Sequence, residues 1–206
     1  MKLVLEKGIG EIIEKKSRFI AHVLYIENEE QAQEYINKLK KKYWDARHNC
    51  YAYVLGDKGE IQRFSDDGEP SGTAGKPILD LITSRELTNC LVVVTRYFGG
   101  ILLGTGGLVR AYQGATIEGL NNSVLGNLID GITGEMDFEY GNLSKVQYIC
   151  DNFGIDIQET EYTEKVHMKL VIENEKIDDF VQKLQNEFSG EIQIVNIVQQ
   201  KICKRI

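Results

Sequence analysis

The sequence predicts an α+β protein of two domains, and two observations support this class. Short runs with apolar residues at every second position alternate with stretches in which apolar residues recur every three or four positions, the periods of strands and helices. Both patterns loosen over residues 121–134, which contain an Asn-Asn-Ser triplet and three glycines. A chain of 206 residues can hold two small domains. We therefore expect domains at 1–130 and 131–206.

Six strands and three helices are expected in the first domain. The strands are predicted at 2–6, 10–14, 17–26, 50–55, 60–64 and 91–94, and the last is apolar enough to be buried on both faces. The first helix begins at a capping box formed by Asn28 and Gln31. The second helix is predicted at 74–84 with Thr73 as its N-cap.

The second domain is expected to have the order strand, helix, strand, strand, helix, strand. Alternating apolar residues predict the strands at 136–140, 155–157, 166–172 and 192–197. Periodic apolar residues predict helices at 143–153, with Asn142 as N-cap, and at 177–188. This is the element order of a ferredoxin-like domain.

Composition excludes several classes of protein. Hydrophobic and charged residues make up 42% and 27% of the chain, which is typical of globular proteins. No signal peptide and no apolar segment long enough to cross a bilayer is recognisable, so we expect a cytoplasmic protein without membrane contact. Cys50, Cys90, Cys150 and Cys203 lie far apart without a C-x-x-C pair, which argues against a zinc site and a disulfide framework.

The net charge of −7 is distributed unevenly between the two expected domains. Residues 1–130 carry a net charge of −1, whereas residues 131–206 carry −6. An extended nucleic-acid surface needs an excess of basic residues, so we expect no DNA partner. Any anion must be bound by a local cluster of cations in the first domain.

A glycine-rich loop lies between the strand at 91–94 and a third helix predicted at 108–120. Thr105 is the predicted N-cap of this helix. The free N–H groups and the positive dipole end of a helix start favour an anion there, and Arg96 and Arg110 flank the loop. The same glycines also fit a tight turn that binds nothing, so both interpretations stay open.

The loop at 65–72 carries three carboxylates, on Asp66, Asp67 and Glu69. Three carboxylates on one loop could hold a hard cation such as Mg²⁺. Asp-Gly and Glu-Pro are, however, ordinary turn sequences. We therefore expect neither a bound metal nor a cofactor.

Three stretches of the sequence, 47–53, 64–77 and 92–112, together resemble the YigZ/IMPACT family. The resemblance covers nearly the whole chain. It implies that the first domain has the fold of the second domain of ribosomal protein five of the small subunit. It also implies that the second domain is similar to the fifth domain of elongation factor G. Eukaryotic members of the family act in translational control by binding the activator of a starvation-responsive kinase, so the resemblance implies a link to translation.

The same stretches predict a ligand-binding site in the first domain, without catalytic residues. Its cations and tyrosine suit phosphate contact and base stacking, and hence single-stranded RNA. The preferred function is binding of RNA or a ribosomal component in translation-linked regulation. The alternatives are an enzyme acting on a phosphorylated small molecule or nucleotide, and a protein-binding regulator of translational control without nucleic-acid contact. The predicted site residues are Arg47, His48, Arg63, Asp66, Asp67, Glu69, Ser71, Thr73, Lys76, Arg96, Tyr97, Gly99, Gly100, Gly104, Thr105, Gly106, Gly107 and Arg110.

Overall fold

The computed structural model describes residues 1–205 of the chain. Contacts divide these residues into two units, Met1–Asn127 together with Arg205, and Leu128–Lys204. Each unit contains helices and strands of a five-stranded sheet, so the chain is a two-domain α+β protein. Within residues 1–205, no helix is both long and apolar enough to cross a membrane.

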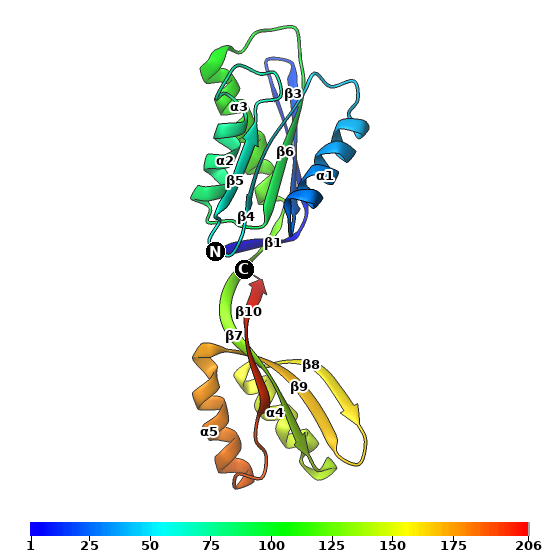
Figure 1. Cartoon of the computed structure of the whole chain (residues 1–206), viewed down its shortest axis with the longest axis vertical. Coiled ribbons are helices and arrows are strands. Elements are labelled where there is room, and N and C mark those ends of the chain that lie inside the picture. The colour runs from blue at the N-terminus through cyan, green and yellow to red at the C-terminus, as the bar shows by residue number, and fades with distance from the viewer. Residues whose placement is uncertain (206) are drawn as a thin grey trace. The chain divides into compact units, whose positions relative to one another are not determined.

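An antiparallel sheet of five strands forms the centre of the first unit (Figure 1). Its strands lie in the order β2 (Gly8–Glu14), β3 (Ser17–Tyr25), β6 (Cys90–Tyr97), β4 (His48–Leu55) and β5 (Ile61–Ser65). The central strand β6 is almost entirely buried, which confirms the prediction of a strand covered on both faces. A sixth strand, β1 (Lys2–Glu6), pairs with the start of β7 instead.

Helices cover both faces of this sheet (Figure 1). On one face lies α1 (Glu29–Lys42), and on the other lie α2 (Gly75–Ser84) and α3 (Gly104–Asn121). Successive residues of β6 lie alternately on the two faces of the sheet. Val92 packs in the core that contains α2 and α3, and Val93 packs in the core that contains α1. This alternation is the period of two that a strand imposes on its side chains.

Glycines allow α3 to lie directly against β2. A Cβ atom on Gly8 or Gly10 would overlap the backbone of Gly119 on α3. A side chain at any of these positions would force the helix away from the sheet, because backbone atoms cannot move aside as a flexible side chain does. This contact sets the position of α3, and therefore of its N-terminus.

The predicted caps of α1 and α2 have opposite outcomes. Asn28 caps α1 as predicted: its Oδ1 accepts the N–H of Gln31, and Gln31 Oε1 accepts the N–H of Glu27. The prediction of Thr73 as N-cap is wrong, since α2 has Ala74 at this position and Thr73 donates its hydroxyl to the carbonyl of Pro70.

In the second unit, helices and strands follow the predicted order of strand, helix, strand, strand, helix, strand. The strands are β7 (Val124–Phe138), β8 (Asp156–Tyr162), β9 (Val166–Glu173) and β10 (Val195–Arg205), and the helices are α4 (Leu143–Phe153) and α5 (Ile177–Phe188). Single 3₁₀ turns, Tyr140–Asn142 and Asn174–Lys176, precede the two helices. In the sheet β7 lies between β9 and β10, and β8 pairs with the other side of β9. Asn142 holds the N-cap position of α4 but makes no side-chain hydrogen bond there.

The segment expected to be loose at 121–134 is largely a strand, because β7 starts at Val124. Two of its glycines, which suggested a break, make room for β10 and for the residue that precedes it. A Cβ atom at Gly131 would overlap Ile202, and one at Gly134 would overlap Ile194. The last predicted strand also differs from the observed one: Ile194 and Ile192 pack into the core before β10 begins at Val195.

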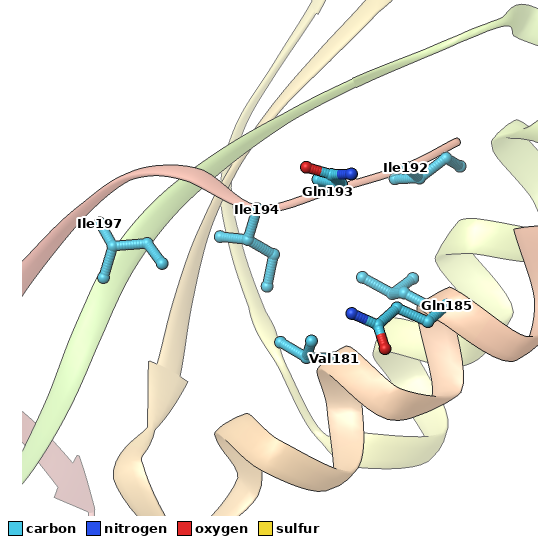
Figure 2. Close-up of a pocket in the computed structure, with 7 residues that line it drawn as sticks. Val181, Gln185, Ile192, Gln193, Ile194 and Ile197 are labelled. Atoms are coloured by element: carbon cyan, nitrogen blue, oxygen red, sulfur yellow. The ribbon is translucent and has the colours of Figure 1, made fainter. Parts of the chain in front are cut away.

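An apolar groove of about 280 Å³ lies in the second unit between α5 and the segment that leads into β10. Figure 2 shows Val181 and Gln185 of α5 facing Ile192 and Ile194 of that segment. The groove offers only aliphatic groups and two glutamine amides, without a charged side chain. It therefore lacks a charged group that could bind an ionic ligand.

His22 is a buried structural residue of β3, in agreement with its apolar sequence surroundings. It is only 6% exposed, and its Nε2 lies 2.8 Å from the hydroxyl of Tyr43. Burial, with smaller effects of Lys42 and Lys7, lowers the pKa of His22 to about 4. The ring is therefore neutral at pH 7 in the folded protein.

This pKa predicts a loss of stability in mild acid. Between pH 6.5 and 4 the unfolded chain binds a proton at His22 that the folded chain excludes, so stability falls as the pH is lowered. Between pH 7 and pH 5 this loss is about 2 kcal/mol. The variant His22→Gln can keep the bond to Tyr43 but has no imidazole to protonate. Urea unfolding should therefore show that its free energy of unfolding decreases by about 2 kcal/mol less between pH 7 and pH 5 than that of the unchanged protein. An equal decrease in both proteins would contradict the assignment.

Candidate functional site

A cavity of about 350 Å³ opens at the N-terminus of α3 in the first unit. One part of its wall is polar, and the other part is apolar. The polar residues are Arg47, His48, Glu69, Arg96 and Thr105, and the remaining lining residues are Gly68, Pro70, Phe98, Leu102, Leu103, Gly104 and Leu108. Its volume and mixed lining are those of ligand sites, so we treat this cavity as the candidate functional site.

A buried ion pair between Glu69 and Arg96 forms the floor of the cavity. Arg96 Nη1 donates to Glu69 Oε1 at 2.6 Å, and the two side chains are only 7% and 3% exposed. Arg96 comes from β6, whereas Glu69 comes from the loop between β5 and α2. The charge of Arg96, for which phosphate contact was predicted, is therefore already matched by the carboxylate of Glu69.

Two further buried groups extend the hydrogen bonding around this pair. Tyr112 on α3 donates its hydroxyl to Glu69 Oε1 at 2.9 Å. Sγ of Cys50 on β4 lies 3.3 Å from the Tyr112 hydroxyl and 2.9 Å from the carbonyl oxygen of Asp66, and its one hydrogen can go to either acceptor. Burial raises the pKa of both the Cys50 thiol and the Tyr112 phenol well above their usual ranges. Both groups stay protonated near neutral pH, so they act as donors and not as nucleophiles.

The Arg96 guanidinium keeps one donor without an acceptor. Nε is buried and has no hydrogen-bond partner among residues 1–205, although Nη2 lies 3.4 Å from the Ser17 hydroxyl. The guanidinium carbon lies 5.3 Å from the ring centre of Phe19 and 5.5 Å from that of Phe98. A buried N–H without a partner is costly, and here it belongs to a residue of the cavity wall.

His48 is held in one tautomer by the backbone. Its Nδ1 lies 2.8 Å from the carbonyl oxygen of Asp67, which can only accept a hydrogen bond. Nδ1 therefore carries the hydrogen in the neutral ring, and Nε2 is left as an acceptor. Nε2 lies 3.9 Å from Glu69 Oε1, so two acceptors meet at the cavity wall.

The carboxylates of Asp66 and Asp67 hold the loop that carries Glu69. Asp66 accepts the N–H groups of Gly72, Ala74 and Gly75, and so caps α2 in place of the predicted Thr73. Asp67 accepts the N–H of Asn49 at 2.7 Å and pairs with Lys40 at 2.8 Å. These contacts give both carboxylates a structural role in shaping the loop.

The N-terminus of α3 lies earlier than expected. The helix begins at Gly104, so Thr105, Gly106 and Gly107 are helical, and the prediction of Thr105 as N-cap is wrong. Leu103 holds the cap position and offers no side-chain acceptor. The first N–H groups of the helix thus lack a side-chain cap beside the cavity, and a bound acceptor can take that role.

Several predicted site residues lie outside the cavity lining. Arg63 lies 3.7 Å from Glu29, Lys76 pairs with Asp80, and Tyr97 donates to Asp45. Gly99 packs so closely on the backbone of Lys16 that it has no room for a Cβ atom, which gives it a structural role. Also outside the lining are Ser71, Gly100, Asp66, Asp67, Thr73, Gly106, Gly107 and Arg110.

Arg110 borders a second hollow, of about 210 Å³, on the other side of Leu103. Gly107 and Lys15 line it as well, together with one carboxylate, that of Glu14. Lys15 lies in the turn between β2 and β3, with φ of +44°. Neither cation is paired with a carboxylate in the described part of the chain, so both are free to contact an anion.

Sequence reasoning missed the apolar half of the cavity. Leu102 is 83% exposed and Phe98 41%, although both are large apolar residues. The signal was present in the sequence as an apolar run inside a glycine-rich loop, Ile101 to Leu103. Exposed apolar residues beside a cavity are typical of a binding surface.

Two family models match the chain. The Impact N-terminal domain matches residues 15–120, and a domain of unknown function (DUF1949) matches residues 136–191. Every residue that lines the cavity lies within the first matched segment.

Individual relatives cover most of the chain. The IMPACT family member YvyE of Bacillus subtilis (strain 168) is 43% identical over 178 residues, 86% of this chain and 82% of that protein. The IMPACT family member YigZ of Escherichia coli (strain K12) is 34% identical over 185 residues, 89% of this chain and 91% of that protein. A solved structure titled as a crystal structure of a hypothetical protein covers 94% of this chain and 95% of its own, with 31% identity and a TM-score of 0.60.

The burial of the Glu69–Arg96 pair predicts a large effect of breaking it. Glu69→Gln keeps the side-chain shape but leaves Arg96 as an uncompensated buried charge, so the free energy of unfolding should fall by about 3–5 kcal/mol. The matched control is Glu11→Gln, which breaks the exposed pair with Arg18 and should cost about 1 kcal/mol or less. Urea unfolding followed by circular dichroism measures both changes. Equal small effects would show that the pair is not desolvated.

Proposed function

Because this chain belongs to the IMPACT family, we propose that it is a translation-linked binding protein whose first unit contacts RNA, without chemistry of its own. The observation that carries the proposal is the cavity at the start of α3. It combines Arg47 and uncapped helix N–H groups, which suit a phosphate, with Phe98 and Leu102, which suit the flat face of a base.

The cations around α3 support a short RNA contact. Arg47 is exposed at the cavity, and Arg110 and Lys15 lie at the neighbouring hollow. None of the three is paired with a carboxylate within residues 1–205. Three phosphate contacts are consistent with the nearly neutral charge of the first domain, which cannot hold a long stretch of RNA.

The implied folds fit this proposal. We propose for the first unit the fold of the second domain of ribosomal protein five, and for the second unit a ferredoxin-like fold similar to the fifth domain of elongation factor G. The element order and strand order of the second unit support the latter. The acidic charge of the second unit argues that RNA contact is confined to the first.

One observation favours a second candidate, an enzyme acting on a nucleotide or a phosphorylated small molecule. The backbone carbonyl of Asp67 orients His48 so that Nε2 is available as a proton acceptor at the cavity wall. A base oriented by a third group is a common arrangement in active sites. Release of a changed nucleotide during the binding experiments below would favour this candidate over simple binding.

Binding to a labelled single-stranded RNA across a salt series tests the proposed function. With three phosphate contacts, log K should fall against log salt with a slope of about −2. Arg47→Ala should weaken binding and reduce the slope by about 0.7, since it removes one contact. Arg85→Ala, at the exposed C-terminal end of α2, serves as the control and should leave both quantities unchanged. Absence of binding at low salt, or equal effects of the two variants, would contradict RNA contact at this site.

A further inference from the structure

We propose that the cavity beside the Glu69–Arg96 pair binds one unpaired guanine base. This inference deepens the proposed function, because it names the part of an RNA that the site takes up. It rests on the polar groups that converge on the cavity wall and on the apolar groups that face them. Neither the family models nor the relatives assign a ligand to this cavity.

Two acceptors at the cavity wall can take two donors from a ligand. Both hydrogen bonds that Glu69 accepts end on Oε1, so its Oε2 keeps its lone pairs. His48 contributes Nε2, because its Nδ1 is engaged by the Asp67 carbonyl. Guanine carries two adjacent donors, N1–H and the 2-amino group, whereas uracil carries a single N–H between two carbonyls.

Arg96, which lines the same cavity, has a donor that still lacks an acceptor among residues 1–205. Arg96 is 5% exposed, and its Nε–H lacks a partner in the described part of the chain. This orphaned donor is an independent indication of a ligand, since buried N–H groups are nearly always bonded. Guanine places its O6 acceptor directly beside N1–H, so one edge of the base matches the donor and both acceptors.

The remaining lining fits the ring and the attached phosphate. Phe98, Leu102 and Leu108 provide apolar surface for a flat heterocycle. Arg47 and the first N–H groups of α3, at Gly104 and Thr105, lie at the same cavity and can take a phosphate. The groove of the second unit in Figure 2 lacks such a combination, since its only polar side chains are Gln185 and Gln193.

Titration calorimetry with GMP and IMP tests this inference. The two nucleotides differ only in the 2-amino group, which Glu69 or His48 should accept, so GMP should bind about tenfold or more tightly than IMP. UMP and inorganic phosphate should bind more weakly still. Equal affinities for GMP and IMP, or phosphate binding as strong as GMP binding, would overturn the assignment of a guanine.

Three variants place the binding in the cavity. Thr105→Phe puts a ring at the cavity wall and should reduce GMP affinity at least tenfold. The control is Ile101→Phe, which adds the same ring to an exposed loop residue outside the lining and should leave GMP affinity unchanged. His48→Asn can keep the bond to the Asp67 carbonyl but removes Nε2, so it should lower the preference for GMP over IMP. These substitutions do not break the buried ion pair, and circular dichroism confirms their folding. Unchanged GMP binding in Thr105→Phe would contradict the inference.

The outcomes separate this inference from the proposed function. RNA binding that depends on Arg47 but shows no preference for guanine-containing oligonucleotides would overturn the guanine site and leave RNA contact standing. Binding of GMP to a chain that does not bind RNA would support the guanine site and overturn the proposed function.

Discussion

The buried pair of Glu69 and Arg96 is the interaction on which the first unit depends. Removing two charges from water is costly, and their attraction offsets this cost only when the remaining polar groups are bonded as well. The chain meets this requirement in part, with Tyr112 from α3 and, more weakly, with Ser17 at the start of β3, while Arg96 Nε–H has no partner among residues 1–205. The pair thereby joins two strands, a helix and a loop that are distant in the sequence.

The position of this pair explains the shape of the cavity. Glu69 can reach Arg96 because Asp66 and Asp67 fix the loop on the start of α2 and on β4. The helix α3 is fixed in turn by its close contact with β2 through Gly119. The cavity lies between the loop that carries Glu69 and the N-terminus of α3, and the contacts named above hold both of them in place. Its polar floor is therefore set before any ligand binds, which lowers the entropic cost of binding.

The sequence predicted those features that depend on local patterns. The buried strand around Val92 and the capping box at Asn28 were both correct, because periodicity and capping involve neighbouring residues. The caps at Thr73 and Thr105 were wrong, since Asp66 caps α2 from eight residues away and α3 starts without a side-chain cap. The glycines of β7 suggested a loop, but Gly131 makes room for a side chain of β10 that is distant in the sequence.

The sequence brought forward some residues of the cavity wall and missed others. Local motifs brought Arg47, His48 and the start of α3 to attention, and these do line one cavity. The sequence could not show that Arg96 is paired, because its partner Glu69 lies 27 residues away on another element. The apolar wall was overlooked for a similar reason: Leu102 resembles an ordinary core residue until its exposure is known.

The most direct test of the cavity as the ligand site is the NMR signal of the Arg96 Nε–H in the ¹⁵N-labelled chain. This group is buried and without an acceptor in the free protein, and it belongs to a residue of the cavity wall, so a ligand that accepts its hydrogen bond should shift its signal. Saturation with a short guanine-containing single-stranded RNA should shift this signal and leave that of Arg85 unchanged. An unchanged Arg96 signal, with shifts only at Arg110 or Lys15, would show that RNA binds beside the cavity and not in it.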